Sequence, residues 1–146
     1  MSSSFFASFS KTPVIQVVGG IPFYLCCYTG LASTTRVGLP GHLIGKTAST
    51  VGTFGCFRNW NVLFRFLTEA VDNNELEQAH FDSISSWFAE TFGNDQMALA
   101  PRRDRLTAFG GDLADGDYDA LYEVYKPDTL IHASAEWTQR QNKPKV

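Results

Sequence analysis

Acidic residues are missing from the first 68 positions of this 146-residue chain, because all 15 Asp and Glu lie between Glu69 and Glu136. The first 68 residues carry five basic side chains and a formal charge of +5. The remaining 78 carry seven basic and 15 acidic side chains, which gives a formal charge of −8. This contrast indicates different surroundings for the two halves and argues against one uniformly solvated surface.

Other residue classes are scarce as well. Charged residues make up 18% of the chain, below the roughly 25% of typical soluble domains. The net charge of −3 lacks the strong basic excess of nucleic-acid binders, so we expect no nucleic-acid partner. The three cysteines, Cys26, Cys27 and Cys56, are odd in number and two are adjacent, which argues against a disulfide framework. Gly45-Lys46-Thr47 lacks the glycine that a phosphate loop needs five positions earlier, where Pro40 stands.

The first half does contain a long uncharged run. The 24 residues from Thr12 to Thr35 carry no charge, and this length suffices for a helix across a bilayer core of about 30 Å. The Gly19-Gly20 pair and Pro22 oppose insertion of an isolated helix, so we expect partner helices beside such a span. The alternative is a β-hairpin in which Val14–Val18 and Ile21–Tyr28 pair across the Gly-Gly turn.

Small residues recur at helical spacing in the glycine-rich stretch that follows. Gly41 and Gly45 are four residues apart, and Ala48 and Gly52 extend the same face. In a helix such a face lets another helix approach closely, which is the packing mode favoured inside membranes. We therefore predict a helix-packing site at Gly41, Gly45, Ala48 and Gly52.

The second half has the apolar periodicity of helices. Asn59–Asp72 and Glu75–Phe92 form the clearest pair and suggest a helical hairpin, with Gly93 as a C-terminal cap. Shorter helices are predicted at Gln96–Ala100, Tyr118–Tyr125 and Asp128–Gln139, the last with Asp128 as N-cap.

Residues with chemical potential are present, but no catalytic pattern emerges. The acidic run Asp115-x-Asp117-x-Asp119 lacks the glycine and glutamate of a calcium loop, so we assign no metal site, cofactor or catalytic residue. Arg102, Arg103 and Arg105 concentrate positive charge in the acidic half. We predict that they bind anionic phospholipid or an acidic partner protein.

Together these features predict a mainly α fold in two parts. Residues 1–57 would form an apolar, glycine-rich segment embedded in a membrane or partner, as a single span or a buried hairpin, and residues 58–146 an acidic helical domain. The predicted function is a non-catalytic accessory subunit of a membrane-bound multiprotein complex. The Ser- and Phe-rich N-terminus favours the mitochondrial inner membrane. The alternative is a soluble, cytoplasmic α+β domain that binds a protein or ligand.

Overall fold

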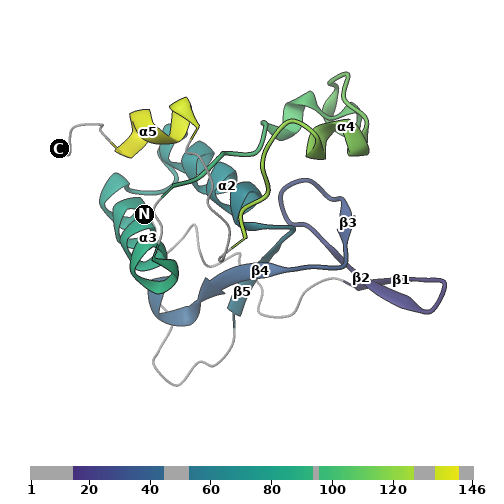
Figure 1. Ribbon diagram of the computed structural model, residues 1–146, viewed down its shortest axis with the longest axis horizontal. Helices are drawn as coiled ribbons and strands as arrows, with labels where there is room; N and C mark the ends of the chain where they lie inside the picture. The colour runs from purple at the N-terminus through teal and green to yellow at the C-terminus, as the bar shows by residue number, and fades with distance from the viewer. Residues whose placement is uncertain (1–14, 45–52, 94–95, 127–133, 142–146) are drawn as a thin grey trace.

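The protein has an α+β architecture, seen in a computed structural model that describes residues 15–44, 53–93, 96–126 and 134–141 (Figure 1). Two small antiparallel sheets, one of three strands and one of two, accompany the helices in the described residues. The predicted mainly α fold with an apolar membrane segment is therefore wrong, and its α+β alternative is the fold observed. Within the described ranges, every helix is too short or too polar to cross a membrane.

The predicted span is instead the first sheet. Strands β1 (Ile15–Val18) and β2 (Ile21–Leu25) form an antiparallel hairpin, and β3 (Ala32–Ser33) pairs with the far end of β2. The turn consists of Gly19 and Gly20, whose φ angles are 58° and 79°. Positive φ at both positions is the requirement of a type I′ turn, which glycine meets without steric cost. This backbone preference, together with β-branched flanking residues, gives a hairpin in place of a helix.

A second sheet connects this hairpin to the helices. Strand β4 (Val37–Pro40) pairs with β5 (Thr53–Phe57), with a register irregularity between Val37 and Leu39. A short 3₁₀ helix, η1 (Gly41–Leu43), follows β4 directly. Figure 1 shows the two-stranded sheet beneath the helices, while the β1–β2 hairpin extends away from them.

Two helices confirm the main helical predictions. Helix α2 (Trp60–Asp72) begins after Asn59, whose side chain accepts a hydrogen bond from the Val62 N–H at 2.9 Å and so caps the helix. Helix α3 (Gln78–Phe92) ends at Gly93, whose left-handed φ of 67° confirms the predicted cap.

The shorter helical predictions are less accurate. Gln96–Ala100 is not helical, because its backbone bonds other segments: the Ala98 carbonyl accepts from the Asn61 side chain at 2.6 Å. Helix α4 (Asp115–Asp119) begins earlier and ends sooner than predicted. Its acidic first turn is stabilised by the helix dipole, whereas the chain beyond it bonds Asn61 through Tyr125 N–H at 2.7 Å.

The remaining described helical elements are short. They are the 3₁₀ helices η2 (Arg103–Arg105) and η3 (Thr107–Phe109) and the C-terminal helix α5 (Ala135–Gln141). Helix α5 overlaps the C-terminal part of the predicted last helix and ends two residues later than predicted, whereas the predicted cap Asp128 lies outside the described residues.

The hydrophobic core centres on α2 and α3. Phe64 of α2 makes edge-on ring contacts with Phe81 and Phe88 of α3 and with Trp137 of α5, at centroid distances of 6.2, 5.1 and 5.2 Å. Leu39 of β4 is fully buried in the same cluster. The core therefore includes residues from both sides of the predicted boundary at position 57, although the two-part organisation itself stays a prediction.

Candidate functional site

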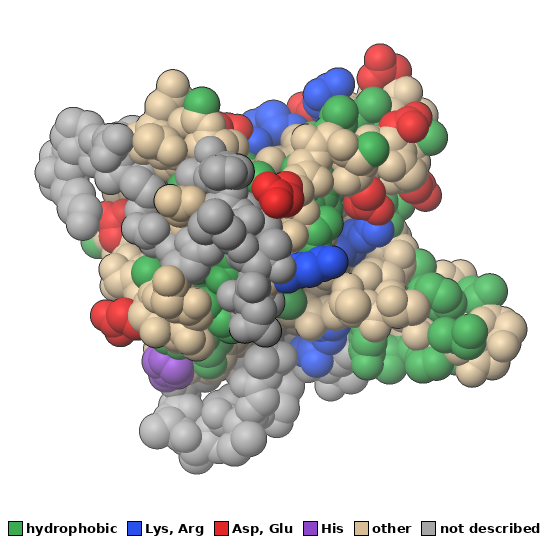
Figure 2. Space-filling model, viewed as in Figure 1, with side chains coloured by type: hydrophobic (Ala, Val, Ile, Leu, Met, Phe, Trp, Pro, Cys, Tyr) green, Lys and Arg blue, Asp and Glu red, His purple; other side chains and the backbone are tan. Residues whose placement is uncertain are grey.

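The most exposed apolar surface of the described chain is the β1–β2 hairpin. Seven large hydrophobic residues are exposed in the described ranges, and four of them lie here: Ile15, Val17, Val18 and Ile21, with exposed fractions of 52%, 67%, 54% and 54%. We call these four residues the hairpin patch. Figure 2 shows hydrophobic side chains gathered along this projection. Contiguous apolar residues on a projecting element are typical of interaction sites.

Both faces of the hairpin are apolar. The register pairs Ile15 with Tyr24 and Val17 with Pro22 on one face. It pairs Gln16 with Phe23 and Val18 with Ile21 on the other. A sheet that covers a core on one side normally alternates apolar and polar residues. This hairpin has no clearly polar face. If one face packed against the rest of the protein, apolar side chains on the other face would therefore still be exposed.

The outer edge of β1 also offers backbone hydrogen-bonding groups. In the three-stranded sheet the order is β1-β2-β3, so among the residues that the structure describes β1 has a partner strand on one side only. The pair that closes a two-residue hairpin is hydrogen-bonded, and bonded and non-bonded pairs then alternate. With Val18 and Ile21 as the closing pair, the N–H and C=O groups of Ile15 and Val17 point outward.

Pro22 fits this alternation. Its partner Val17 is at a non-bonded position, so proline's missing N–H removes no bond to β1. On its other side β3 pairs only with Tyr24 and Leu25. The proline therefore stands where the sheet narrows from three strands to two, which is a tolerated position.

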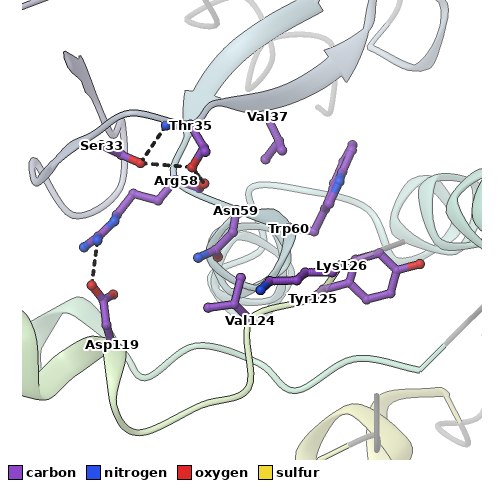
Figure 3. A pocket seen from close by; sticks show the side chains of 10 residues that line it. All are labelled: Ser33, Thr35, Val37, Arg58, Asn59, Trp60, Asp119, Val124, Tyr125 and Lys126. Carbon is purple, nitrogen blue, oxygen red and sulfur yellow. Dashed lines mark hydrogen bonds and ion pairs between the residues drawn. The ribbon is translucent and has the colours of Figure 1, made fainter. Parts of the chain in front are cut away.

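A hollow of about 530 Å³ lies at the start of α2 (Figure 3). Its lining comes from three separate parts of the chain: Ser33, Thr35 and Val37; Arg58, Asn59 and Trp60; Asp119, Val124, Tyr125 and Lys126. Figure 3 shows Arg58 reaching toward Asp119, and their Nη2 and Oδ2 atoms are 2.6 Å apart. This ion pair connects the end of β5 to the end of α4.

The polar groups of the hollow bond mainly to one another. Asn59 Nδ2 donates to Tyr122 Oη at 3.0 Å, and Tyr122 Oη donates to Asp119 Oδ1 at 3.4 Å. Burial raises the pKa of Tyr122 to about 12, so this hydroxyl stays protonated near neutral pH. Thr35 Oγ1 donates to the Arg58 carbonyl at 3.0 Å. The described part of the lining holds no cysteine or histidine, and its one carboxylate, Asp119, is paired with Arg58. These contacts join three separate parts of the chain.

The three predicted binding arginines have different surroundings. The Arg103 guanidinium lies 5.2 Å from the ring centroids of both Tyr28 and Phe109, and its backbone N–H donates to Tyr28 Oη at 2.9 Å. Arg102 is near Glu69, with Nη1 and Oε1 3.5 Å apart. Arg105 is exposed and makes no ion pair with any described residue. Only part of this positive charge is therefore available, and lipid or partner binding stays a prediction.

The predicted helix-packing residues are only partly described. Gly41 is buried in η1, directly after β4, and belongs to no long helix. Gly45, Ala48 and Gly52 lie outside the described residues. The acidic run coincides with α4, where Asp119 binds Arg58. In the described ranges, no three His, Cys, Asp or Glu side chains are close enough together to hold a metal ion.

The sequence predicts the hairpin as the alternative to a membrane span, but it does not predict that the hairpin is exposed. The Gly19-Gly20 turn between β-branched runs is visible in the sequence, and its apolar character was attributed to burial. The hollow was missed entirely, because Arg58 and Asp119 are 61 positions apart and no local pattern relates them.

The fold and its projecting hairpin define a small α+β domain with an open, apolar edge strand. Comparison with known proteins adds no relative: no family model matches the chain, and neither a curated protein nor a solved structure is significantly similar to it.

Proposed function

We propose that this chain is a protein-binding α+β domain that recognises an extended segment of a partner by adding it as a strand beside β1. The observation that carries the proposal is the hairpin patch on an open edge strand. A long-lived exposed edge of this kind promotes nonspecific pairing unless charge or proline protects it. β1 contains neither.

The chemistry of the edge favours a particular partner. Backbone N–H and C=O groups of Ile15 and Val17 would supply the main-chain bonds of strand addition, and the side chains would select alternate residues of the incoming strand. No residue from Ile15 to Thr35 is charged. An incoming segment that placed a charge against this surface would bury it without a counter-ion. The partner segment is therefore uncharged, β-branched and free of proline over about four residues.

Self-pairing of β1 is a weaker explanation. The strand has only four residues, and two copies joined along it alone would bury less than the roughly 1,200 Å² of a stable interface. A partner that also covers the outer faces of Val18 and Ile21 would bury more apolar surface. Membership in a membrane-bound assembly stays a prediction that this proposal does not require.

The proposal is tested with a synthetic peptide of alternating valine and threonine, flanked by soluble residues outside its central strand. Binding is followed by NMR, and amide exchange is measured for each residue. We expect the Ile15 and Val17 amides to become protected when the peptide binds. Val17→Lys places a charge on the edge and should weaken binding at least about 10-fold. Leu121→Lys, an equally apolar and 51% exposed position outside the hairpin, is the matched control and should bind like the natural chain.

Several results would overturn strand addition. Equal binding by Val17→Lys, or peptide binding without protection at Ile15 and Val17, would remove β1 from the interface. A dimer in light scattering that dissociates in Val17→Lys would identify a second copy as the occupant. Flotation with phospholipid vesicles that is lost in the same variant would identify a lipid surface instead.

A further inference from the structure

Two of the three cysteines, Cys27 and Cys56, are hydrogen-bonded to each other where the two sheets meet. Cys27 lies two residues after the end of β2 and is exposed, whereas Cys56 lies in β5 and is 3% exposed. The Cys27 N–H donates to the Cys56 carbonyl at 2.6 Å. The Cys56 N–H donates to Cys27 Sγ at 3.2 Å. The sulfur of Cys27 thus touches the backbone nitrogen of Cys56, which is three covalent bonds from the Cys56 sulfur.

The third cysteine, Cys26, is buried in the core. Cys26 is 4% exposed and belongs to the hydrophobic core cluster, whereas its neighbour Cys27 is exposed. The hydrogen bond from the Cys56 N–H to Cys27 Sγ therefore identifies Cys27 and Cys56 as the candidate pair, despite the adjacency of Cys26 and Cys27 in the sequence.

The electrostatic surroundings keep both thiols protonated. Burial raises the pKa of Cys27, and the hydrogen bond from the Cys56 N–H and the charge of Arg36 offset this only in part. Burial also raises the pKa of Cys56, and the nearby Cys27 raises it further. A catalytic or metal-binding thiolate needs a lowered pKa. Slow oxidation by an external reagent needs only a small thiolate fraction and close sulfurs.

We propose that Cys27 and Cys56 form a reversible disulfide when the protein meets a small-molecule disulfide such as oxidised glutathione. The exposed Cys27 loses its proton to solvent and its thiolate attacks one sulfur of the oxidant, which releases one glutathione thiolate. Cys56 then loses its proton and attacks the Cys27 sulfur of this mixed disulfide, which releases the second. The two protons lost by the cysteines convert the leaving thiolates to two molecules of reduced glutathione. The protein is oxidised by two electrons and the oxidant is reduced by two.

The cross-link would join the end of β2 to β5. It would close a loop of the chain between positions 27 and 56. Such a loop lowers the conformational entropy of the unfolded chain, which is the usual source of disulfide stabilisation. It would also tie the base of the β1–β2 hairpin to the second sheet covalently. This inference does not depend on the proposed partner-binding function.

The test uses the full chain with Cys26→Ala, because adjacent cysteines cannot be distinguished by peptide mapping. The folded protein is equilibrated with mixtures of reduced and oxidised glutathione, quenched by alkylation, and analysed by intact mass and peptide mapping. We expect the free thiols of Cys27 and Cys56 to be lost together. Peptide mapping should show the two cysteine peptides linked by a disulfide, and intact mass should show no glutathione attached to the protein. Dithiothreitol should restore both. The melting temperature of the oxidised form should rise by roughly 5–10 °C.

Single replacements provide the controls. Cys27→Ser in the otherwise natural chain should form no intramolecular disulfide, because the two remaining thiols, Cys26 and Cys56, are 4% and 3% exposed and neither is accessible to the oxidant. If Cys26→Ala fails to fold, intact mass of the natural chain still measures the loss of two hydrogens, and Cys27→Ser still tests the pairing. A stable glutathione adduct on Cys27, a disulfide between two chains, or cross-linking only in urea would overturn the proposal.

Discussion

Asn61 joins three segments of the chain through one buried side chain. Its Nδ2 donates to the carbonyls of Ala98 and Glu123 at 2.6 and 2.8 Å, and its Oδ1 accepts from the Tyr125 N–H at 2.7 Å. The residue is fully buried on α2. It therefore satisfies backbone groups of two segments that have no regular secondary structure of their own, and it fixes both against the helix.

Replacing Asn61 with Ala should lower the free energy of unfolding by about 3 kcal/mol or more, because three buried backbone groups lose their partner at about 1–3 kcal/mol each. Urea unfolding at neutral pH measures the loss. Thr91→Ala, an exposed position on α3, is the control and should change stability by less than about 0.5 kcal/mol. A loss below about 1 kcal/mol for Asn61→Ala would show that water or a shifted chain replaces these bonds.

A second buried polar contact gives a pH dependence. Arg65, 6% exposed on α2, donates from Nη1 and Nη2 to both carboxylate oxygens of Glu136 at 2.8 and 2.6 Å. These hydrogen bonds hold the pKa of Glu136 below its ordinary value of 4.5. The unfolded chain then binds the proton more readily than the folded one, so stability is lost as pH falls below about 4.5 through the lower folded pKa.

Glu136→Gln should remove this part of the acid sensitivity. We expect the natural chain to be more stable than the variant near neutral pH, and the difference to shrink as pH falls from about 7 to about 3. Chemical unfolding of both proteins at several pH values measures it. If the free energies of unfolding of the two proteins fell in parallel as the pH was lowered, Glu136 would not be the group responsible for the loss of stability in acid.

Among the elements, the hairpin turn is the most sensitive to sequence. Replacing Gly19 and Gly20 with two valines should open the β1–β2 hairpin, because β-branched residues strongly disfavour positive φ and a left-handed residue costs about 1–2 kcal/mol. Replacement with Asn-Gly should preserve it. Cross-strand NMR contacts between Ile15 and Tyr24 report the result. The global melting temperature should change little, since the hairpin patch contributes little to the core. Persistent contacts in the valine variant would contradict this assignment of the turn.

The elements differ in how far the sequence predicts them, and the reason is the range of the determining interactions. Helices α2 and α3 follow from local periodicity, a capping Asn59 and a terminal Gly93, all of which act within a few residues. The hairpin also has a local signal in its Gly19-Gly20 turn, but the uncharged run that contains it is long enough to be interpreted equally well as a membrane span. Gln96–Ala100 looked helical because its neighbour across the fold, Asn61, cannot be recognised from a local window.

The same limit applies to the candidate binding surface. The β-branched residues of β1 could be recognised, yet a sequence does not say whether such residues are covered. Exposure depends on whether another element packs over the hairpin. In the described structure the helices pack on β4 and β5 and leave the hairpin patch open.

At the scale of the whole molecule, several polar contacts join the two halves that differ in charge. Arg58 binds Asp119, Arg65 binds Glu136, and Tyr28 Oη donates to Glu69 at 2.7 Å. Each contact joins the acid-free half to the acidic half. Some opposite charges of the two halves are therefore paired within one fold, and different surroundings for the two halves stay a prediction.

This shared core predicts one cooperative unfolding transition. Leu39→Ala in β4, a fully buried position, should destabilise the entire protein by about 2–5 kcal/mol. Val17→Ala, 67% exposed on the hairpin, is the control and should have little effect. Far-ultraviolet circular dichroism and tryptophan fluorescence should report the same midpoint in each variant. Two separate transitions would instead support independent parts divided near position 57.

The Arg65–Glu136 pair has a consequence for synthesis of the chain. The two residues are 71 positions apart, and a ribosome makes Arg65 long before its partner exists. Until then this guanidinium cannot be buried without a counter-ion, which is strongly unfavourable. The α2 surface must therefore stay hydrated on the nascent chain, and its final packing awaits emergence of α5. The domain should complete its fold late in translation, with a period in which chaperones have access to α2.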